Sequence, residues 1–164
     1  MLKKSIAVLT LCLTACSWQF KNNERFPEAL RTLSFESADQ YSEMSRILRQ
    51  QMLLSDINIV PHGNEIAHLR LNSSESRAYV ASVFKHAREA EKILNLSVKA
   101  TITVPNKGQY PLEVSINRTF FDDSRAALAK SEEQASIMRQ MYEQASRQLL
   151  VKIAGLHSEI NKAQ

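Results

Sequence analysis

The chain has 164 residues with 21 basic and 17 acidic side chains, which gives a formal net charge of +4 and a pI of about 9.2. This length suits one domain with a real hydrophobic core, and three glycines and four prolines argue against a low-complexity linker. The basic excess is not arranged as a tract with interleaved aromatics, so composition does not indicate a nucleic-acid-binding protein.

The first fifteen residues have the pattern of a signal peptide. Lys3 and Lys4 form a positive n-region, and residues 6–13 form an apolar stretch too short to span a membrane. The run LTAC that ends at Cys16 resembles the bacterial lipobox. That resemblance implies cleavage before Cys16, an S-diacylglycerol group on its thiol and an N-acyl group on its new amino terminus; the alternative is an ordinary secretory signal. Several acyl chains hold a domain on a bilayer, whereas one binds reversibly.

Removing residues 1–15 changes what the composition means. Cys12 leaves with the signal and Cys16 carries lipid, so the mature chain is expected to have no disulfide and no thiolate metal site. Loss of two lysines leaves 19 basic against 17 acidic side chains, a net charge of +2. We expect residues 16–29 to form a lipidated tether and residues 30–164 to form a single domain.

Two periodic segments open this domain. Residues 30–36 alternate as a strand does, and residues 40–54 change to a helical period. Ser37 or Asp39 is available to cap the start of that helix. Its predicted apolar face consists of Tyr41, Met44, Ile47, Leu48 and Met52.

A β-rich region follows. Residues 56–60 predict a short strand that Pro61 ends, and residues 69–71 and 77–84 predict further strand, with polar residues 72–75 between them.

The clearest alternation lies over residues 94–104, where Leu, Val, Ala and Ile alternate with polar side chains. Residues 105–109 predict a hairpin loop in which Gly108 can take a positive φ. Residues 112–116 repeat the alternation, so we expect two antiparallel neighbours, each with one buried face.

The longest helix is predicted at the end of the chain. Ser131 can cap it and Gln134 stands where a capping box places its second member. Its expected apolar stripe is Ala135, Met138, Met141, Tyr142, Ala145, Leu149 and Ile153. The predicted fold class is therefore α/β (α+β): a two-layer sandwich in which two helices pack on one face of a four-stranded, mostly antiparallel mixed sheet, with one early strand-helix-strand crossover.

A series of short motifs resembles the LptE family of lipopolysaccharide-assembly lipoproteins. No single motif identifies that family, but their order and spacing do. They are CSWQF at 16–20, ASVF at 81–84, YP at 110–111, FFDD at 120–123, ALAK at 127–130, EQ at 133–134 and MY at 141–142.

The resemblance implies a plug that sits largely inside the lumen of the outer-membrane β-barrel LptD, supports its assembly and helps lipopolysaccharide reach the outer leaflet. Ser17 after the lipidated cysteine implies sorting to the outer membrane, anchored on its periplasmic side. By their flanking motifs, Lys85 and Lys130 match basic positions that the family presents to lipopolysaccharide phosphates, and His86 and Arg88 add to the Lys85 patch. In place of the glycine turn of some relatives, the chain has KHARE at 85–89.

Barrel contacts are expected at two places. One is the hairpin that ends at Tyr110 and Pro111, and the other is the pair Phe120 and Phe121. Neighbours in a strand point to opposite faces, so at least one of these two phenylalanines should lie outside the core. The second interpretation of both is packing beneath the long helix.

The sequence gives little support to catalysis. It has no His-Glu-x-x-His spacing, no Gly-x-Ser-x-Gly elbow and no glycine-rich phosphate loop, and the adjacent Asp122 and Asp123 are better explained by a turn or a helix cap. No metal or organic cofactor is implied. The alternative function is a stand-alone lipid carrier or envelope adaptor that faces the periplasm, for which a deep apolar cavity would be needed.

Overall fold

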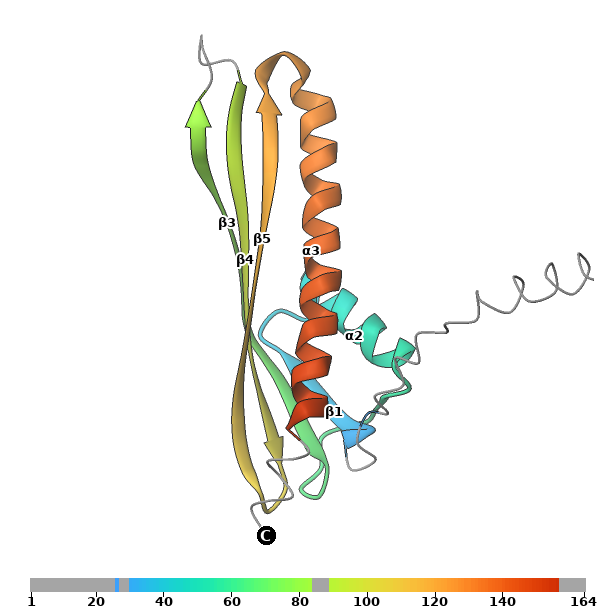
Figure 1. Cartoon of the computed structure of the whole chain (residues 1–164). Coiled ribbons are helices and arrows are strands. Elements are labelled where there is room, and N and C mark those ends of the chain that lie inside the picture. Colours follow the sequence, from blue (N-terminus) through green and yellow to red (C-terminus); the bar gives the residue numbers. More distant parts are fainter. Residues whose placement is uncertain (1–25, 27–29, 84–88, 157–164) are drawn as a thin grey trace, which may run out of the picture.

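The computed structural model describes residue 26 and residues 30–83 and 89–156. Its elements follow in the order β1 (Thr32–Ser37), α2 (Glu43–Leu54), β2 (Asn58–Ile59), β3 (Ala67–Val83), β4 (Glu89–Val104), β5 (Gly108–Asp123), η3 (Ser124–Ala126) and α3 (Ala127–Gly155). The strands form one mixed sheet in the order β2-β1-β3-β4-β5, and both helices lie on the same side of it (Figure 1). The predicted fold class is confirmed, with five strands in place of four.

The sheet combines parallel and antiparallel pairing. β1 is parallel to β2 and to β3, so α2 is the crossover between β1 and β2, as expected. β3, β4 and β5 are joined as antiparallel neighbours, and their pairing continues for almost their whole length. Thus the early part of the chain builds one edge of the sheet and the later part builds two long hairpins.

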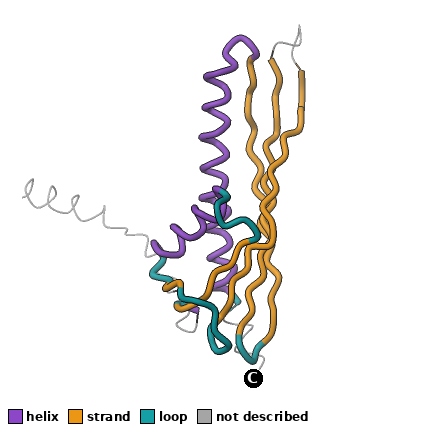
Figure 2. Tube along the Cα trace, turned by 180° about the vertical axis from the view of Figure 1, so that it is seen from behind, coloured by secondary structure: helices purple, strands orange, loops and turns teal. Residues whose placement is uncertain are grey.

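The molecule is elongated because three strands and one helix extend far beyond the other elements. β1 pairs with β3 only as far as Leu71, and from Ser73 to Val83 the outer edge of β3 has no strand neighbour among the described residues. We call the extended part, which holds this stretch of β3, its partners in β4 and β5 and the first half of α3, the arm. The remainder, with β1, α2 and β2, is the base. Figures 1 and 2 show the arm rising from the base and the long strands twisting about one another.

One hydrophobic core lies between the sheet and the helices. The apolar residues of β4 that alternate in the sequence are all buried, and they are Leu94, Leu96, Val98, Ala100, Ile102 and Val104. Met141, Ala145, Leu149 and Ile153 bury the stripe of α3 against them, whereas Ala135 is exposed. Phe26 belongs to this same core. The apolar stripe of the helix and the apolar face of the strand therefore pack against each other, as predicted.

The start of α2 differs from the prediction. Ser42 is the N-cap, and its Oγ accepts from the Ser45 amide at 3.3 Å. Neither Ser37 nor Asp39 caps the helix; instead the Ser37 hydroxyl donates to the Asp39 carbonyl at 2.9 Å. Tyr41 comes before the cap and is 90% exposed, so its assignment to the apolar face was wrong.

The start of α3 also differs. The helix begins at Ala127, directly after η3, and Ser131 lies inside it, where its hydroxyl donates to the Leu128 carbonyl at 2.7 Å. Asp123 is the N-cap of η3, because its side chain accepts from the Arg125 amide at 2.9 Å, and α3 itself has no side-chain cap. The suggestion that the acidic pair forms a cap is confirmed for this residue.

Candidate functional site

The far end of the arm, which we call the tip, gathers charged side chains from β4, β5 and the start of α3. Lys130 lies there, with its Nζ 2.8 Å from the Glu133 carboxylate and 5.5 Å from the centre of the Phe120 ring. Its side chain is only 25% exposed. Lys130 is therefore held between an acidic group and an aromatic face, in a cation-π arrangement.

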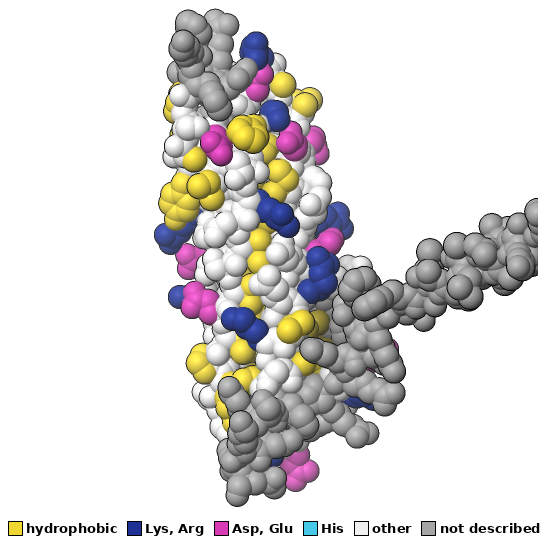
Figure 3. All heavy atoms as spheres, viewed as in Figure 1, with side chains coloured by type: hydrophobic (Ala, Val, Ile, Leu, Met, Phe, Trp, Pro, Cys, Tyr) yellow, Lys and Arg dark blue, Asp and Glu magenta, His cyan; other side chains and the backbone are white. Residues whose placement is uncertain are grey.

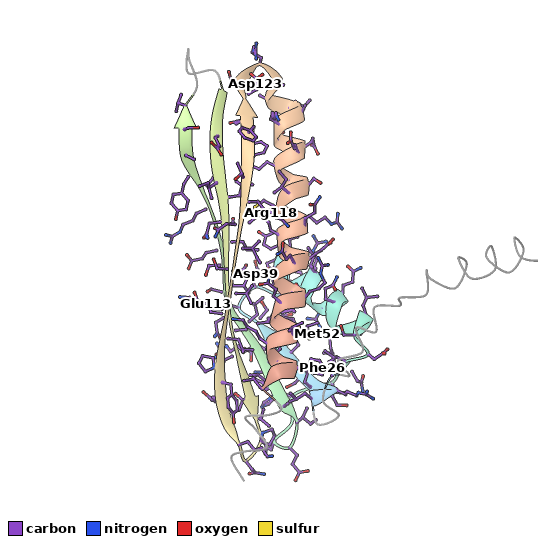
Figure 4. All side chains as sticks on the ribbon, viewed as in Figure 1. Phe26, Asp39, Met52, Glu113, Arg118 and Asp123 are labelled. Carbon is purple, nitrogen blue, oxygen red and sulfur yellow. The ribbon has the colours of Figure 1, made fainter. Side chains whose placement is uncertain are left out.

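Two further ion pairs surround it. Lys92 contacts Asp122 at 2.5 Å between β4 and β5, and Arg125 contacts Asp123 at 2.9 Å in the turn before α3. Hydrogen bonds from the Arg125 side chain and amide lower the pKa of Asp123, and the nearby charge of Lys130 lowers it further. Figure 4 places Asp123 at the end of the arm. Each of these three cations thus already has a carboxylate partner.

The other predicted phosphate-binding residue, Lys85, lies outside the described residues, as do His86 and Arg88. They fall between Val83, the last residue of β3, and Glu89, the first residue of β4. Those strand ends are at the same end of the molecule as the start of α3, the helix that carries Lys130 (Figure 1). The structure therefore brings Lys130 to the end of the arm at which the β3-β4 connection is made, without describing Lys85 itself.

The residues expected to touch a barrel do not form one surface. Tyr110 and Pro111 lie at the base end of β5, where the Tyr110 hydroxyl donates to the Lys107 carbonyl at 3.0 Å. Phe120 and Phe121 lie about 33 Å further along the strand, at roughly 3.3 Å per residue. Phe120 is buried against the helix side and Phe121 is 56% exposed on the other side. Of this pair, only Phe121 is available to a partner.

Phe121 belongs to an apolar patch that sequence reasoning missed. Tyr79 is directly opposite Ile93 in the β3-β4 ladder, and Phe121 is opposite Glu91, two residues from Ile93. Tyr79 and Ile93 are 51% and 38% exposed. The sequence does contain a signal for this patch. At the strand positions that face away from the helices, most residues are polar, but each of the three strands has one large apolar residue there. These three residues are called the apolar patch below.

The rest of that uncovered sheet face is polar. The Asn95 amide donates to Asn117 at 2.7 Å, and Asn72 donates to Thr101 at 2.8 Å, in each case across neighbouring strands. Figure 3 shows the molecule from the side, with the strands and α3 next to each other, and there basic and acidic side chains are interspersed along the long axis with apolar groups between them. Such a surface suits water or a polar wall better than lipid.

Polar contacts fix α3 to the sheet along its length. Arg118 donates to Gln144 at 2.8 Å, and Lys152 donates to the Glu113 carbonyl of β5 at 2.6 Å. Burial raises the pKa of Tyr142, which also interacts with Ser76 of β3. Figure 4 shows Arg118 and Glu113 at successive heights along the molecule. The helix is therefore tied to both long hairpins.

A second polar cluster lies in the base. The Ser34 hydroxyl is 2.9 Å from His68 Nδ1 and 3.4 Å from His62 Nδ1, and His68 Nε2 is 3.3 Å from Glu36. Ser34 is only 3% exposed, so its hydroxyl is not accessible to a substrate. Sequence reasoning treated these histidines as isolated residues, and nothing in their spacing revealed that β1 and β3 bring them together.

Within the described ranges, no set of three or more His, Cys, Asp or Glu side chains is placed to hold a metal ion. The described helices include none with the length and hydropathy needed to cross a bilayer.

Comparison with known proteins decides the family. The family model LptE, described as lipopolysaccharide-assembly, matches residues 30–153. This chain belongs to the LptE family. The LPS-assembly lipoprotein LptE of Pectobacterium atrosepticum is 35% identical over 150 residues, covering 90% of this chain and 82% of that protein. The protein of the same name from Yersinia enterocolitica is 35% identical over 162 residues, covering 97% of this chain and 78% of its own length.

Solved structures agree with this assignment. The crystal structure of the rare lipoprotein B from Shewanella oneidensis has 30% identity and a TM-score of 0.74, covering 79% of this chain and 98% of that one. A minor lipoprotein from Acinetobacter baumannii has the same fold at 15% identity, with a TM-score of 0.63 over 78% of this chain and 93% of its own. The LptE fold is therefore shared with known bacterial lipoproteins.

Proposed function

We propose that this chain is an outer-membrane lipoprotein, lipidated at Cys16, that assists assembly of lipopolysaccharide at the outer leaflet. The two relatives named above are both called LPS-assembly lipoproteins and are similar over most of the chain. In this proposal the arm stands inside the lumen of an LptD barrel and the tip receives the phosphates of lipopolysaccharide.

The observation that supports this arrangement most is the length of the molecule and what lies at each end. β3, β4 and β5 have 16 to 17 residues each, which corresponds to roughly 55 Å at about 3.3 Å per residue. The 29 residues of α3 correspond to about 44 Å. These lengths exceed the hydrocarbon thickness of a bilayer, which is about 30 Å, and so does the arm portion of β3 alone, at roughly 36 Å for Ser73 to Val83. A base held at the inner leaflet can therefore carry the tip across the membrane.

The polar uncovered face fits this placement as well. A barrel lumen is lined by polar side chains and water, so an inserted domain has no need of a lipid-facing surface. The Asn95-Asn117 pair lies along the arm on that face. The apolar patch gives one place for a closer contact with the barrel wall.

The affinity for lipopolysaccharide tests whether the lysines of the tip bind its phosphates. Lys85→Ala together with Lys130→Ala should weaken the affinity of the purified mature protein for lipopolysaccharide without lowering its melting temperature. Lys99→Ala is the matched control, because Lys99 is exposed on β4 away from the tip. Equal affinity in the double variant and the wild type would contradict phosphate binding by these lysines.

Co-purification of the lipoprotein tests whether it binds a barrel partner. From detergent-solubilised membranes we expect a stoichiometric complex with a much larger β-barrel protein. Recovery of the lipoprotein alone would favour the stand-alone carrier. Radioactive palmitate should label the wild type and not Cys16→Ser, which checks the anchor separately.

A further inference from the structure

The outward face of α2 carries apolar residues that the core does not use. Leu53 and Leu54, at the carboxyl end of the helix, are 60% and 70% exposed, although Met44, Leu48 and Met52 on the inward face are completely buried. Leu53 follows Arg49 by four residues and Arg46 by seven, so these three side chains share one helix face. Both arginines are exposed. We call Arg46, Arg49, Leu53 and Leu54 the α2 surface.

The surroundings of the α2 surface are slightly basic. Arg31, at the start of the domain, is exposed near the same end of α2, while Asp56 follows the helix and Glu43 lies one helix length away, at its other end. Arg49 also lies over the ring of Phe35, 5.1 Å from its centre, which holds this cation at the helix surface. Two exposed leucines beside arginines form a small version of the apolar and basic surface with which interfacial helices bind anionic membranes.

The tether enters the fold next to this surface. Phe26 belongs to the same core cluster as Met52, and Figure 4 shows the two residues close together. The Phe26 carbonyl accepts from Arg31 Nε at 3.3 Å, and the Arg31 carbonyl accepts from the Asn58 amide at 2.6 Å. Asn58 comes four residues after Leu54. These contacts fix the point of entry at the carboxyl end of α2.

The reach of the tether limits how far this end lies from the bilayer. Phe26 follows Cys16 by ten residues, and a fully extended chain of that length spans at most about 35 Å. The start of α3, by contrast, is about 44 Å from the carboxyl end of that helix, which lies in the base. Leu53 and Leu54 therefore lie within reach of the membrane, whereas Leu128 at the start of α3 lies far from the tether.

We propose that the α2 surface rests on the lipid surface that holds the acyl chains of Cys16, and that anionic headgroups are its partner. This inference rests on the lipidation proposed above and adds a second, non-covalent membrane contact. Two leucines bind a bilayer only weakly in a free protein, but a short tether keeps them at a high effective concentration, so that even a weak contact is populated. The contact orients the base, and hence the direction in which the arm leaves the membrane.

A single environment-sensitive fluorophore tests the contact. Because the lipidated mature chain has no free thiol, Leu54→Cys gives one labelling site. Leu128→Cys is the matched control: this residue is also exposed, at 79%, but lies at the start of α3, far from the tether. On vesicles of phosphatidylethanolamine and phosphatidylglycerol, the emission at position 54 should shift to the blue, and the emission at position 128 should not.

The same experiment separates the possible failures. No shift at position 54, or an equal shift at positions 54 and 128, would overturn the proposal. Charge reversal by Arg46→Glu with Arg49→Glu should reduce the shift at position 54 on anionic vesicles, and an unchanged shift would show that headgroup charge is not the partner. Flotation with the vesicles reports the Cys16 lipid independently. A protein that does not float contradicts the proposed anchor, whereas one that floats without a shift contradicts only the contact of α2.

Discussion

At the level of single residues, Lys130 shows that a cation at the expected position is not a free cation. Its Nζ is paired with Glu133 and lies over Phe120, so a lipid phosphate has to replace a carboxylate that is already present. If the tip binds phosphate as proposed above, this competition lowers its affinity.

Glu133→Gln should therefore strengthen the binding of lipopolysaccharide. Removing a competing carboxylate from a partly exposed pair is worth about 0.2 to 1 kcal/mol, which corresponds to roughly a 1.4- to 5-fold lower dissociation constant. Calorimetric titration of both proteins measures it. Glu143→Gln, which removes the partner of Arg147 further along α3, should leave the affinity unchanged. A gain that persists when Lys130→Ala is added to Glu133→Gln would contradict this explanation.

The carboxylate of Asp123 makes the tip sensitive to acid. Arg125 lowers its pKa below the ordinary value of 3.8, so the ionised form is favoured in the folded protein. The stability that the ionised Asp123 contributes to the fold is complete above the pKa of this group in the unfolded chain. It is lost as the pH falls through the lower pKa of the folded protein. In a carboxyl NMR titration, Arg125→Ala should move the midpoint of Asp123 upward. An unmoved midpoint would assign the shift to another group.

At the level of elements, each helix has one buried serine, and we expect replacement by alanine to have opposite effects on stability at the two positions. The Ser45 hydroxyl is 2.6 Å from both the Asp39 carbonyl and the Ser37 hydroxyl, so it holds the β1-α2 connection. The Ser146 hydroxyl, in α3, is equally buried but has no hydrogen-bond partner among the described residues. One hydroxyl is satisfied and the other carries a desolvation cost.

Ser45→Ala should lower the free energy of unfolding by about 1 to 2 kcal/mol, and Ser146→Ala should raise it by about 1 kcal/mol, because alanine removes an unsatisfied group and has the higher helix propensity. Denaturant unfolding of the two variants measures both changes, and each serves as the control for the other. Destabilisation by Ser146→Ala would show that its hydroxyl has a partner after all.

The elements that the sequence predicted well are those in which periodicity and burial coincide. β4 is the clearest case, since its alternating residues face α3 directly. β3 was predicted as two strands with polar residues 72–75 between them, whereas it is continuous with a bulge between Leu71 and Ser73. The bulge shifts the parity of the strand, and α3 packs mainly on β5 and β4, so Ser74 and Ser76 in the arm portion of β3 need not be apolar.

The candidate site was predictable in position and not in detail. The FFDD and ALAK motifs placed charged and aromatic residues around Lys130, and the structure puts them at one end. The pairing of Lys92 with Asp122 depends on the register between β4 and β5, which single-strand patterns do not reveal. The grouping of His62 and His68 likewise depends on the parallel pairing of β1 with β3.

At the level of the whole molecule, the arm and the base differ in how completely their backbone is satisfied. The base has β1 and β2 paired beyond β3, whereas the outer edge of β3 from Ser73 to Val83 has no strand neighbour in the described part of the chain. Such an edge exposes amide groups and invites a covering surface. If the arm enters a barrel, its edge and the apolar patch are the places where the surroundings change most.

Hydrogen exchange of the isolated lipoprotein and of its complex with the barrel should show this difference. In the isolated protein we expect slow exchange in β1, where Leu33 is completely buried, and faster exchange in the outer part of β3. In the complex, protection should rise in the arm, above all in β3 beyond Ser73, and stay nearly constant in β1. Addition of lipopolysaccharide without barrel is the control and should not protect the β3 edge. A gain confined to the base would mean that the base, rather than the arm, enters the barrel, because a wall can slow exchange only where it covers the backbone.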